Sequence, residues 1–132
     1  MSEEELNKLA YEAQYLQQQA QEMQRQLQQA IAIASQLEAA AKTIEGLKDN
    51  KEEDYFQLGG GAFIKAKTAE NSGILMDIGA GVFAEKNPEE AKELMQKRKK
   101  DVEKAMEILK NNLQKLTRRL QEIDGLAEDL QQ

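Results

Sequence analysis

A heptad repeat of apolar residues runs through the first third of the chain. Alternating steps of three and four residues from Leu6 to Ile44 meet an apolar residue each time, at positions 6, 9, 13, 16, 20, 23, 27, 30, 34, 37, 41 and 44. Such a repeat keeps one stripe of a helix facing a partner helix over many turns. The repeat therefore predicts a coiled-coil helix over residues 3–48.

A second heptad runs through the last third of the chain. All its positions except Lys99 are apolar: 95, 99, 102, 106, 109, 113, 116, 120, 123, 127 and 130. Asn87 as N-cap, Pro88 at the first helical position and Glu90 in a capping box predict a helix over residues 87–132. The similar lengths favour an antiparallel pair. In an antiparallel pair, the numbers of facing residues have a constant sum. A sum of 136 places the heptad positions of the two helices opposite each other, although a register shifted by seven residues would do so too.

The segment between the helices has a different composition, with six of the eight glycines and all three phenylalanines. Gly59-Gly60-Gly61 and Gly79-Ala80-Gly81 each separate two short runs rich in β-branched and aromatic residues. This pattern predicts two β-hairpins in series over residues 52–86, with a turn at residues 70–73. A phosphate-binding loop is the competing interpretation of the first glycine run, but no Gly-Lys-Ser/Thr leads into a helix.

These elements predict a single domain over residues 1–132: a mainly α fold with a small β region. A long antiparallel two-helix coiled coil would carry two β-hairpins where the chain folds back. A pair of helices this long has one seam between them and little core. Something else must therefore cover the central segment. Open strand edges pair with other chains. We therefore expect the two hairpins to mediate oligomerisation.

The composition argues against several functions. There is no Cys and no His, which removes thiol and imidazole chemistry and the usual zinc ligands. The net charge of -6 argues against binding to nucleic acid or anionic membranes. No apolar run approaches a membrane span, and the N-terminus is acidic where a signal peptide is basic. We expect a cytoplasmic protein that is not an enzyme and has no metal or cofactor.

Three segments of the central region form recognisable motifs: Leu58-Gly59-Gly60-Gly61-Ala62-Phe63-Ile64-Lys65-Ala66, Ile78-Gly79-Ala80-Gly81-Val82 and Glu85-Lys86-Asn87. These motifs resemble those of prefoldin, the chaperone of the archaeal and eukaryotic cytosol. Two hairpins rather than one are typical of its alpha-class subunits. The resemblance implies a hexamer of two alpha-class and four beta-class subunits, joined by a β-barrel platform of hairpins. Coiled-coil tips would hold unfolded polypeptide without ATP and deliver it to a group II chaperonin.

The alternative is a self-assembling structural coiled-coil protein, a filament or spacer, that uses the same hairpins but needs no adhesive tips. Some alpha-like members of the family assemble with themselves. Under either interpretation, the predicted assembly residues are Phe56, Leu58, Phe63, Ile64, Ile74, Met76, Ile78, Val82 and Phe83.

The excess of apolar side chains near the two termini favours the chaperone. Tyr11, Tyr15 and Leu126 lie outside the heptads, and Gly125 weakens its helix by up to about 1 kcal/mol relative to Ala. We expect this end to fray and expose its apolar residues. The predicted client-binding residues are Leu6, Leu9, Tyr11, Tyr15, Ile123, Leu126 and Leu130.

Two polar runs have simpler interpretations. The nine glutamines between Gln14 and Gln29 are interpreted as a solvated helix face made of good helix formers. The run Lys97-Arg98-Lys99-Lys100 is interpreted as a solvated surface balanced by nearby glutamates. Docking of the basic run to an acidic neighbour is the alternative.

Overall fold

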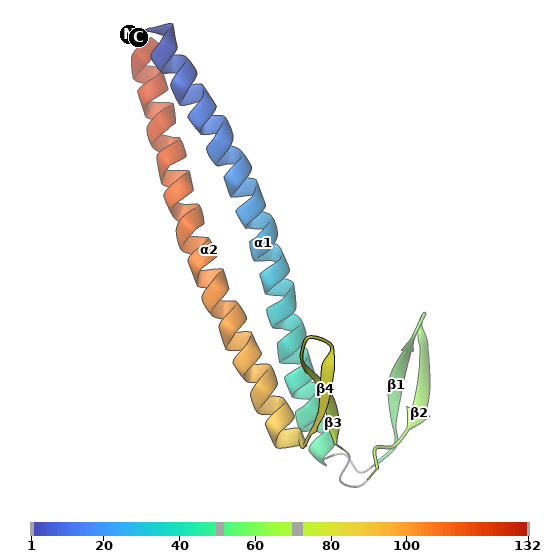
Figure 1. Cartoon of the computed structure of the whole chain (residues 1–132). Coiled ribbons are helices and arrows are strands. Elements are labelled where there is room, and N and C mark those ends of the chain that lie inside the picture. Colours follow the sequence, from blue (N-terminus) through green and yellow to red (C-terminus); the bar gives the residue numbers. More distant parts are fainter. Residues whose placement is uncertain (1, 50–51, 70–72, 132) are drawn as a thin grey trace. The chain divides into compact units, whose positions relative to one another are not determined.

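The structure is a computed structural model that describes residues 2–49, 52–69 and 73–131. Two long helices, α1 (Glu3–Asp49) and α2 (Pro88–Gln131), flank two pairs of strands in the sequence (Figure 1). The strands are β1 (Asp54–Gly59), β2 (Ala62–Ala66), β3 (Ile74–Gly79) and β4 (Val82–Lys86). This element order confirms the predicted fold class. Most of the turn predicted at residues 70–73 lies outside the described residues.

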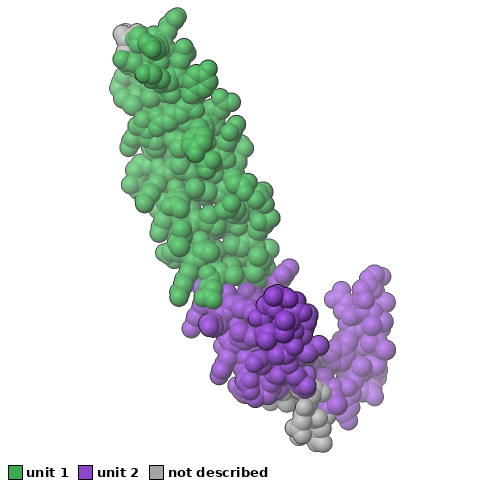
Figure 2. Space-filling view, viewed as in Figure 1, with its two compact units in different colours: residues 1–34, 101–132 green, residues 35–100 purple. Residues whose placement is uncertain are grey.

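The chain divides into two compact units (Figure 2). Unit 1 contains residues 1–34 and 101–132, and unit 2 contains residues 35–100. Each helix therefore contributes one part to each unit. In the described part of the chain, neither helix is long and apolar enough to cross a membrane.

Unit 1 is a pair of antiparallel helical segments. Every heptad position in it, 6 to 34 in α1 and 102 to 130 in α2, is buried or half-buried, whereas most positions between them are exposed. Ile123, at 3% exposure, is its most buried large side chain. Outside the seam, the Arg119 guanidinium donates to the Glu12 carboxylate, with Nε 2.8 Å from Oε1 and Nη2 3.0 Å from Oε2. The buried stripe is the seam that the heptads predict.

In unit 2, the end of α1 lies antiparallel to the start of α2. Lys92 Nζ is 2.7 Å from Glu45 Oε2, and Lys99 Nζ is 2.8 Å from Glu38 Oε2. The residue numbers in each pair add to 137, next to the predicted 136 and far from a slip of seven. These pairs also show how α2 accommodates Lys99, the polar residue of its heptad. Its stem is half-buried while its ammonium reaches a carboxylate.

The start of α2 is fixed by its cap. The backbone N–H of Glu90 donates to Asn87 Oδ1 at 2.8 Å, and Asn87 Nδ2 donates to Glu90 Oε1 at 2.5 Å. The cap satisfies a backbone donor that the first helical turn leaves without a partner. Asn87 and Glu90 therefore pair with each other, as the sequence predicts.

The two hairpins repeat one pattern at an offset of 20 residues. Phe56 pairs with Ile64 as Met76 pairs with Ala84, and both ladders shift register just before the turn. The shift leaves Leu58 and Ile78 in equivalent bulges. The turns also match, since both central residues have positive φ, 60° and 81° at Gly60-Gly61 and 51° and 75° at Ala80-Gly81. Two positive φ angles are typical of type I′ hairpins, which explains the glycines.

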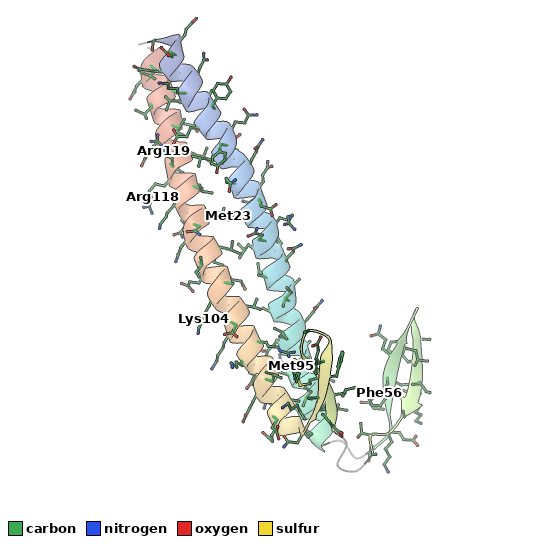
Figure 3. The ribbon with its side chains drawn as sticks, viewed as in Figure 1. Met23, Phe56, Met95, Lys104, Arg118 and Arg119 are labelled. Atoms are coloured by element: carbon green, nitrogen blue, oxygen red, sulfur yellow. The ribbon has the colours of Figure 1, made fainter. Side chains whose placement is uncertain are left out.

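The core of unit 2 joins the β3–β4 hairpin to the helices. Met76 is 3% exposed and packs in a cluster with Ile44 of α1 and Ala91 of α2, which is fully buried. Met95 packs against this cluster beside the hairpin (Figure 3). The Arg98 guanidinium also donates to the backbone carbonyl of Asp77. One face of β3–β4 is therefore held by its own chain.

Candidate functional site

Most of the predicted assembly residues are exposed in the single chain. Side chains on both hairpins leave 49–67% of their surface uncovered. Each hairpin exposes three such side chains, and exposed apolar surfaces of this kind are typical of interfaces. These exposed residues are Leu58, Phe63, Ile64, Ile78, Val82 and Phe83.

The other three predicted assembly residues are less accessible. Phe56 and Ile74 are half-buried, and Ile74 packs against the core of unit 2. Met76 is inside that core. In the single chain, Met76 therefore supports the hairpin from behind and has no surface left for a partner.

The sequence analysis did not include two exposed residues of the hairpins. Tyr55 is 65% exposed and Leu75 is 69% exposed, and they occupy equivalent positions at the 20-residue offset. Successive side chains of a strand point to opposite faces. Because Met76 faces the core, Leu75 lies on the outer face of β3–β4. The alternation of side chains along the strand indicates that Leu75 and Met76 face opposite ways. Only the packing of the β3–β4 hairpin on the helices shows which of the two faces is exposed.

The predicted client-binding residues also fall into two classes. Tyr11, Tyr15 and Leu126 are 73%, 61% and 43% exposed and are accessible as they stand. Leu6, Leu9 and Leu130 are half-buried, and Ile123 is buried. These four seam residues become available only where the helices separate. Gly125 has open space around it and does not interrupt α2.

An ion pair that the sequence analysis missed joins the helices beside these tyrosines. Glu12 lies between Tyr11 and Tyr15 in α1, and its partner Arg119, labelled on α2 in Figure 3, also binds Glu122 at 3.2 Å. The hydrogen bonds from Arg119 lower the pKa of Glu12 and, with those to Glu122, raise the pKa of Arg119. The sequence does contain the opposite charges beside the two heptads from which an ion pair between the helices can be predicted.

The basic run of α2 binds partly to its own chain. Lys99 pairs with Glu38, and Arg98 reaches the Asp77 carbonyl, while Lys97 and Lys100 are exposed. The hydrogen bond from Lys99 lowers the pKa of Glu38. Within the described residues, no group of three or more carboxylates could hold a metal ion. The exposed apolar and aromatic side chains of the hairpins, and those near the two termini, are the surfaces suited to binding other chains.

Comparisons with known proteins agree with this architecture. The family model "Prefoldin subunit" matches residues 16–132. Prefoldin subunit alpha of Pyrococcus horikoshii is 30% identical over 131 residues, covering 97% of this chain and 88% of the relative. Prefoldin subunit alpha of Methanosarcina barkeri is 31% identical over 137 aligned positions, covering 100% of this chain and 95% of the relative.

A solved structure shares the fold. A chain of filamentous prefoldin from Methanocaldococcus jannaschii, determined by cryo-electron microscopy, superposes with a TM-score of 0.75 at 16% identity. The match covers 88% of this chain and 98% of the other. With a family model that spans most of the sequence, and with relatives that align along nearly all of it, the chain belongs to the prefoldin subunit family.

Proposed function

We propose that this chain is a subunit of an ATP-independent holdase that captures unfolded polypeptide at the ends of its helices near the two termini. Membership of a family of chaperones supports this proposal. The observation that carries it is the exposure of Tyr11, Tyr15 and Leu126 together near the two termini. Farther along the helix pair, the large apolar residues lie in the seam apart from Ile31, Ile33 and Ile108. An unfolded client offers apolar side chains that such a surface binds weakly, and several tips acting together raise the avidity.

Assembly through the hairpins is the second part of the proposal. The exposed apolar residues of β1–β4 would be covered by beta-class subunits in a β-barrel platform, giving two alpha-class and four beta-class chains. The assembled complex would then hand its client to a group II chaperonin in the cytoplasm. Its partners would be proteins, with no nucleic acid or membrane.

A self-assembling structural protein is the second candidate. The Methanocaldococcus jannaschii chain that shares the fold comes from a filamentous prefoldin. Exposed strands on both hairpins would allow copies of one chain to cover each other. Electron microscopy of the purified chain, with and without a beta-class subunit, distinguishes the two assemblies, because filaments that persist with the partner present favour the structural role.

Light scattering from a denatured client diluted into buffer tests the holdase directly, with a beta-class partner present and no ATP. We expect aggregation of the client to be suppressed when the complex is present in a nearly stoichiometric amount. The double variant Tyr11→Ser/Tyr15→Ser removes the exposed tyrosines without touching the seam, and we expect it to suppress aggregation less. Ile108→Ser is the control, since it removes a large apolar side chain of similar exposure, 61%, from the middle of α2, away from both the hairpins and the termini.

The assembly of each variant is checked by sedimentation before the assay. Equal protection by the tyrosine variant and the control would contradict capture at the tips. Deletion of residues 1–11 and 123–132 is the stronger form of the test. Full protection of the client by an assembled complex of the truncated chain would exclude capture at the tips. Chaperonin delivery has its own measurement, the transfer of labelled client to chaperonin on native gels.

A further inference from the structure

An open groove runs along one side of the helix pair in unit 1. Its volume is about 770 Å³, and Leu27 of α1 and Leu113 of α2 contribute the apolar part of its lining. A smaller hollow of about 310 Å³ shares Leu113 and continues along α2 past Thr117 to Gln121. The glutamines that line the larger groove are Gln21, Gln24, Gln28 and Gln114.

Three glutamines of the run in α1 line this groove, and two more continue the same stripe toward the N-terminus. Gln14, Gln17, Gln21, Gln24 and Gln28 follow the same steps of three and four as the apolar seam, so five of the nine glutamines form one stripe. Such a stripe stays on one side of the seam along the helix. From Gln14 to Gln28 it extends about 21 Å at 1.5 Å per residue. About six residues of extended chain have that length.

The chemistry of the stripe suits the backbone of an extended chain. Each glutamine amide offers both donors and an acceptor, so it can bind a peptide N–H or a peptide C=O. The side chains of Gln21, Gln24 and Gln28 are exposed, and no hydrogen bond with another described residue engages their amides. Backbone recognition of this kind does not depend on the sequence bound, and the leucines below can contact apolar side chains.

The charge of the groove is opposite to that of the protein. Arg25 and Lys110 line the larger groove and Arg118 lines the smaller hollow, with no carboxylate in either lining. Arg25 is neutralised by Glu22 at 2.5 Å. No ion pair within the described chain engages Lys110 or Arg118. In a chain with a net charge of -6, this local positive charge favours an acidic ligand.

We propose that this groove binds an extended, acidic segment of unfolded polypeptide along the shaft of the helix pair. The inference rests on the proposed holdase function and deepens it, because it adds a polar site of sequence-independent backbone binding to the apolar contacts near the termini. The glutamine run would then belong to the surface that binds the client, in addition to forming a solvated helix face.

Two forms of one unfolded protein provide the probe. Reduced α-lactalbumin is alkylated either with iodoacetate, which adds carboxylates, or with iodoacetamide, which does not. Each fluorescent form is titrated with the assembled complex at low salt, and binding is followed by anisotropy. We expect Lys110→Glu/Arg118→Glu to weaken binding of the carboxylate form about tenfold, since each exposed pair contributes a factor of about two to five. The amide form should lose less.

The matched control is Lys104→Glu/Lys115→Glu, which makes the same charge change on α2 at exposed residues outside the groove. A second pair of variants tests the amides. Gln21→Ala/Gln24→Ala/Gln28→Ala should weaken binding of both probes. Gln18→Ala/Gln29→Ala/Gln36→Ala, which alters exposed glutamines of α1 outside the stripe, should leave binding of both unchanged. Alanine favours helix at least as well as glutamine, so neither triple variant should unfold α1.

Equal effects of groove and control variants would overturn the inference. So would a change in the size of the complex on charge reversal at the groove, because the groove would then be a subunit interface. Loss of client binding in Tyr11→Ser/Tyr15→Ser with full binding in both groove variants would leave the holdase intact and reject the groove. Failure of the unmodified complex to bind either probe would reject the proposed function itself.

Discussion

Replacement of Met76 by alanine tests whether the β3–β4 hairpin is held by its own chain. Met76 is 3% exposed and packs on Ile44 and on the fully buried Ala91. Met76→Ala removes three heavy atoms, which corresponds to about 2.4 kcal/mol at about 0.8 kcal/mol per buried methylene-sized group. The half-buried neighbours Leu94 and Met95 can partly fill the space, which keeps the cavity term small. We therefore expect a loss of about 2–3 kcal/mol.

The loss should appear as local opening of the hairpin. Native-state hydrogen exchange measures it directly, because amides of β3 and β4 exchange through this opening. A loss of 2–3 kcal/mol corresponds to roughly 30- to 150-fold faster exchange in these strands. Amides in the middle of unit 1 should exchange at the same rate as in the unmodified chain.

The adjacent residue provides the control. Leu75 is 69% exposed on the opposite face, so Leu75→Ala should change hairpin exchange by less than about 0.5 kcal/mol in the free chain. In assembly the order of the two effects should be reversed. We expect Leu75→Ala to weaken association with a partner more than Met76→Ala does, because Leu75 is the exposed residue of the two. Unchanged exchange in Met76→Ala, or equal acceleration in both variants, would refute the placement of Met76 in the core.

Three further predictions concern the backbone, the seam and pH. Gly79 has a φ of 125°, so Gly79→Ala should destabilise its hairpin by about 1–3 kcal/mol in denaturant titrations, whereas Gly46→Ala in α1 should stabilise by up to about 1 kcal/mol. Ile123→Ala should cost about 2–4 kcal/mol in the same assay, but Leu126→Ala, 43% exposed, less than about 1 kcal/mol. Glu12 and Glu38 have pKa values lowered below 4.5, so their stabilisation is present above pH 4.5 and is lost as the pH falls through the lowered values. Thermal melts should show a smaller loss of stability on acidification in Glu12→Gln and Glu38→Gln than in the unmodified chain, and equal losses would contradict the pairing.

The sequence predicted the helices and the two hairpin turns because their signals are local. Apolar residues from Leu6 to Ile44 define a seam by their spacing alone. Asn87 with Glu90 marks the start of α2, and the glycines at 60, 61 and 81 mark positive φ angles. Each depends on side chains or dihedral angles within one or two turns of chain, so a single sequence contains the information.

The site was predicted less completely because exposure is not local. Phe63 and Phe83 were predicted to mediate assembly, and both are exposed in the single chain. Met76 carries the same kind of signal but lies in the core, whereas Leu75 beside it is exposed. Alternation along a strand says that these two neighbours face opposite ways, but it does not say which face is buried.

The sequence by itself therefore determined the element order, the heptad seam and the positions of the two hairpin turns, since periodicity and backbone preference act over a few residues. The tertiary structure alone decided which hairpin face packs on Ile44 and Ala91, and it paired Glu12 with Arg119 across the seam. It also lined a groove with glutamines from both helices. These features join residues far apart in the chain, so their formation depends on packing and register between helices, which no local pattern specifies.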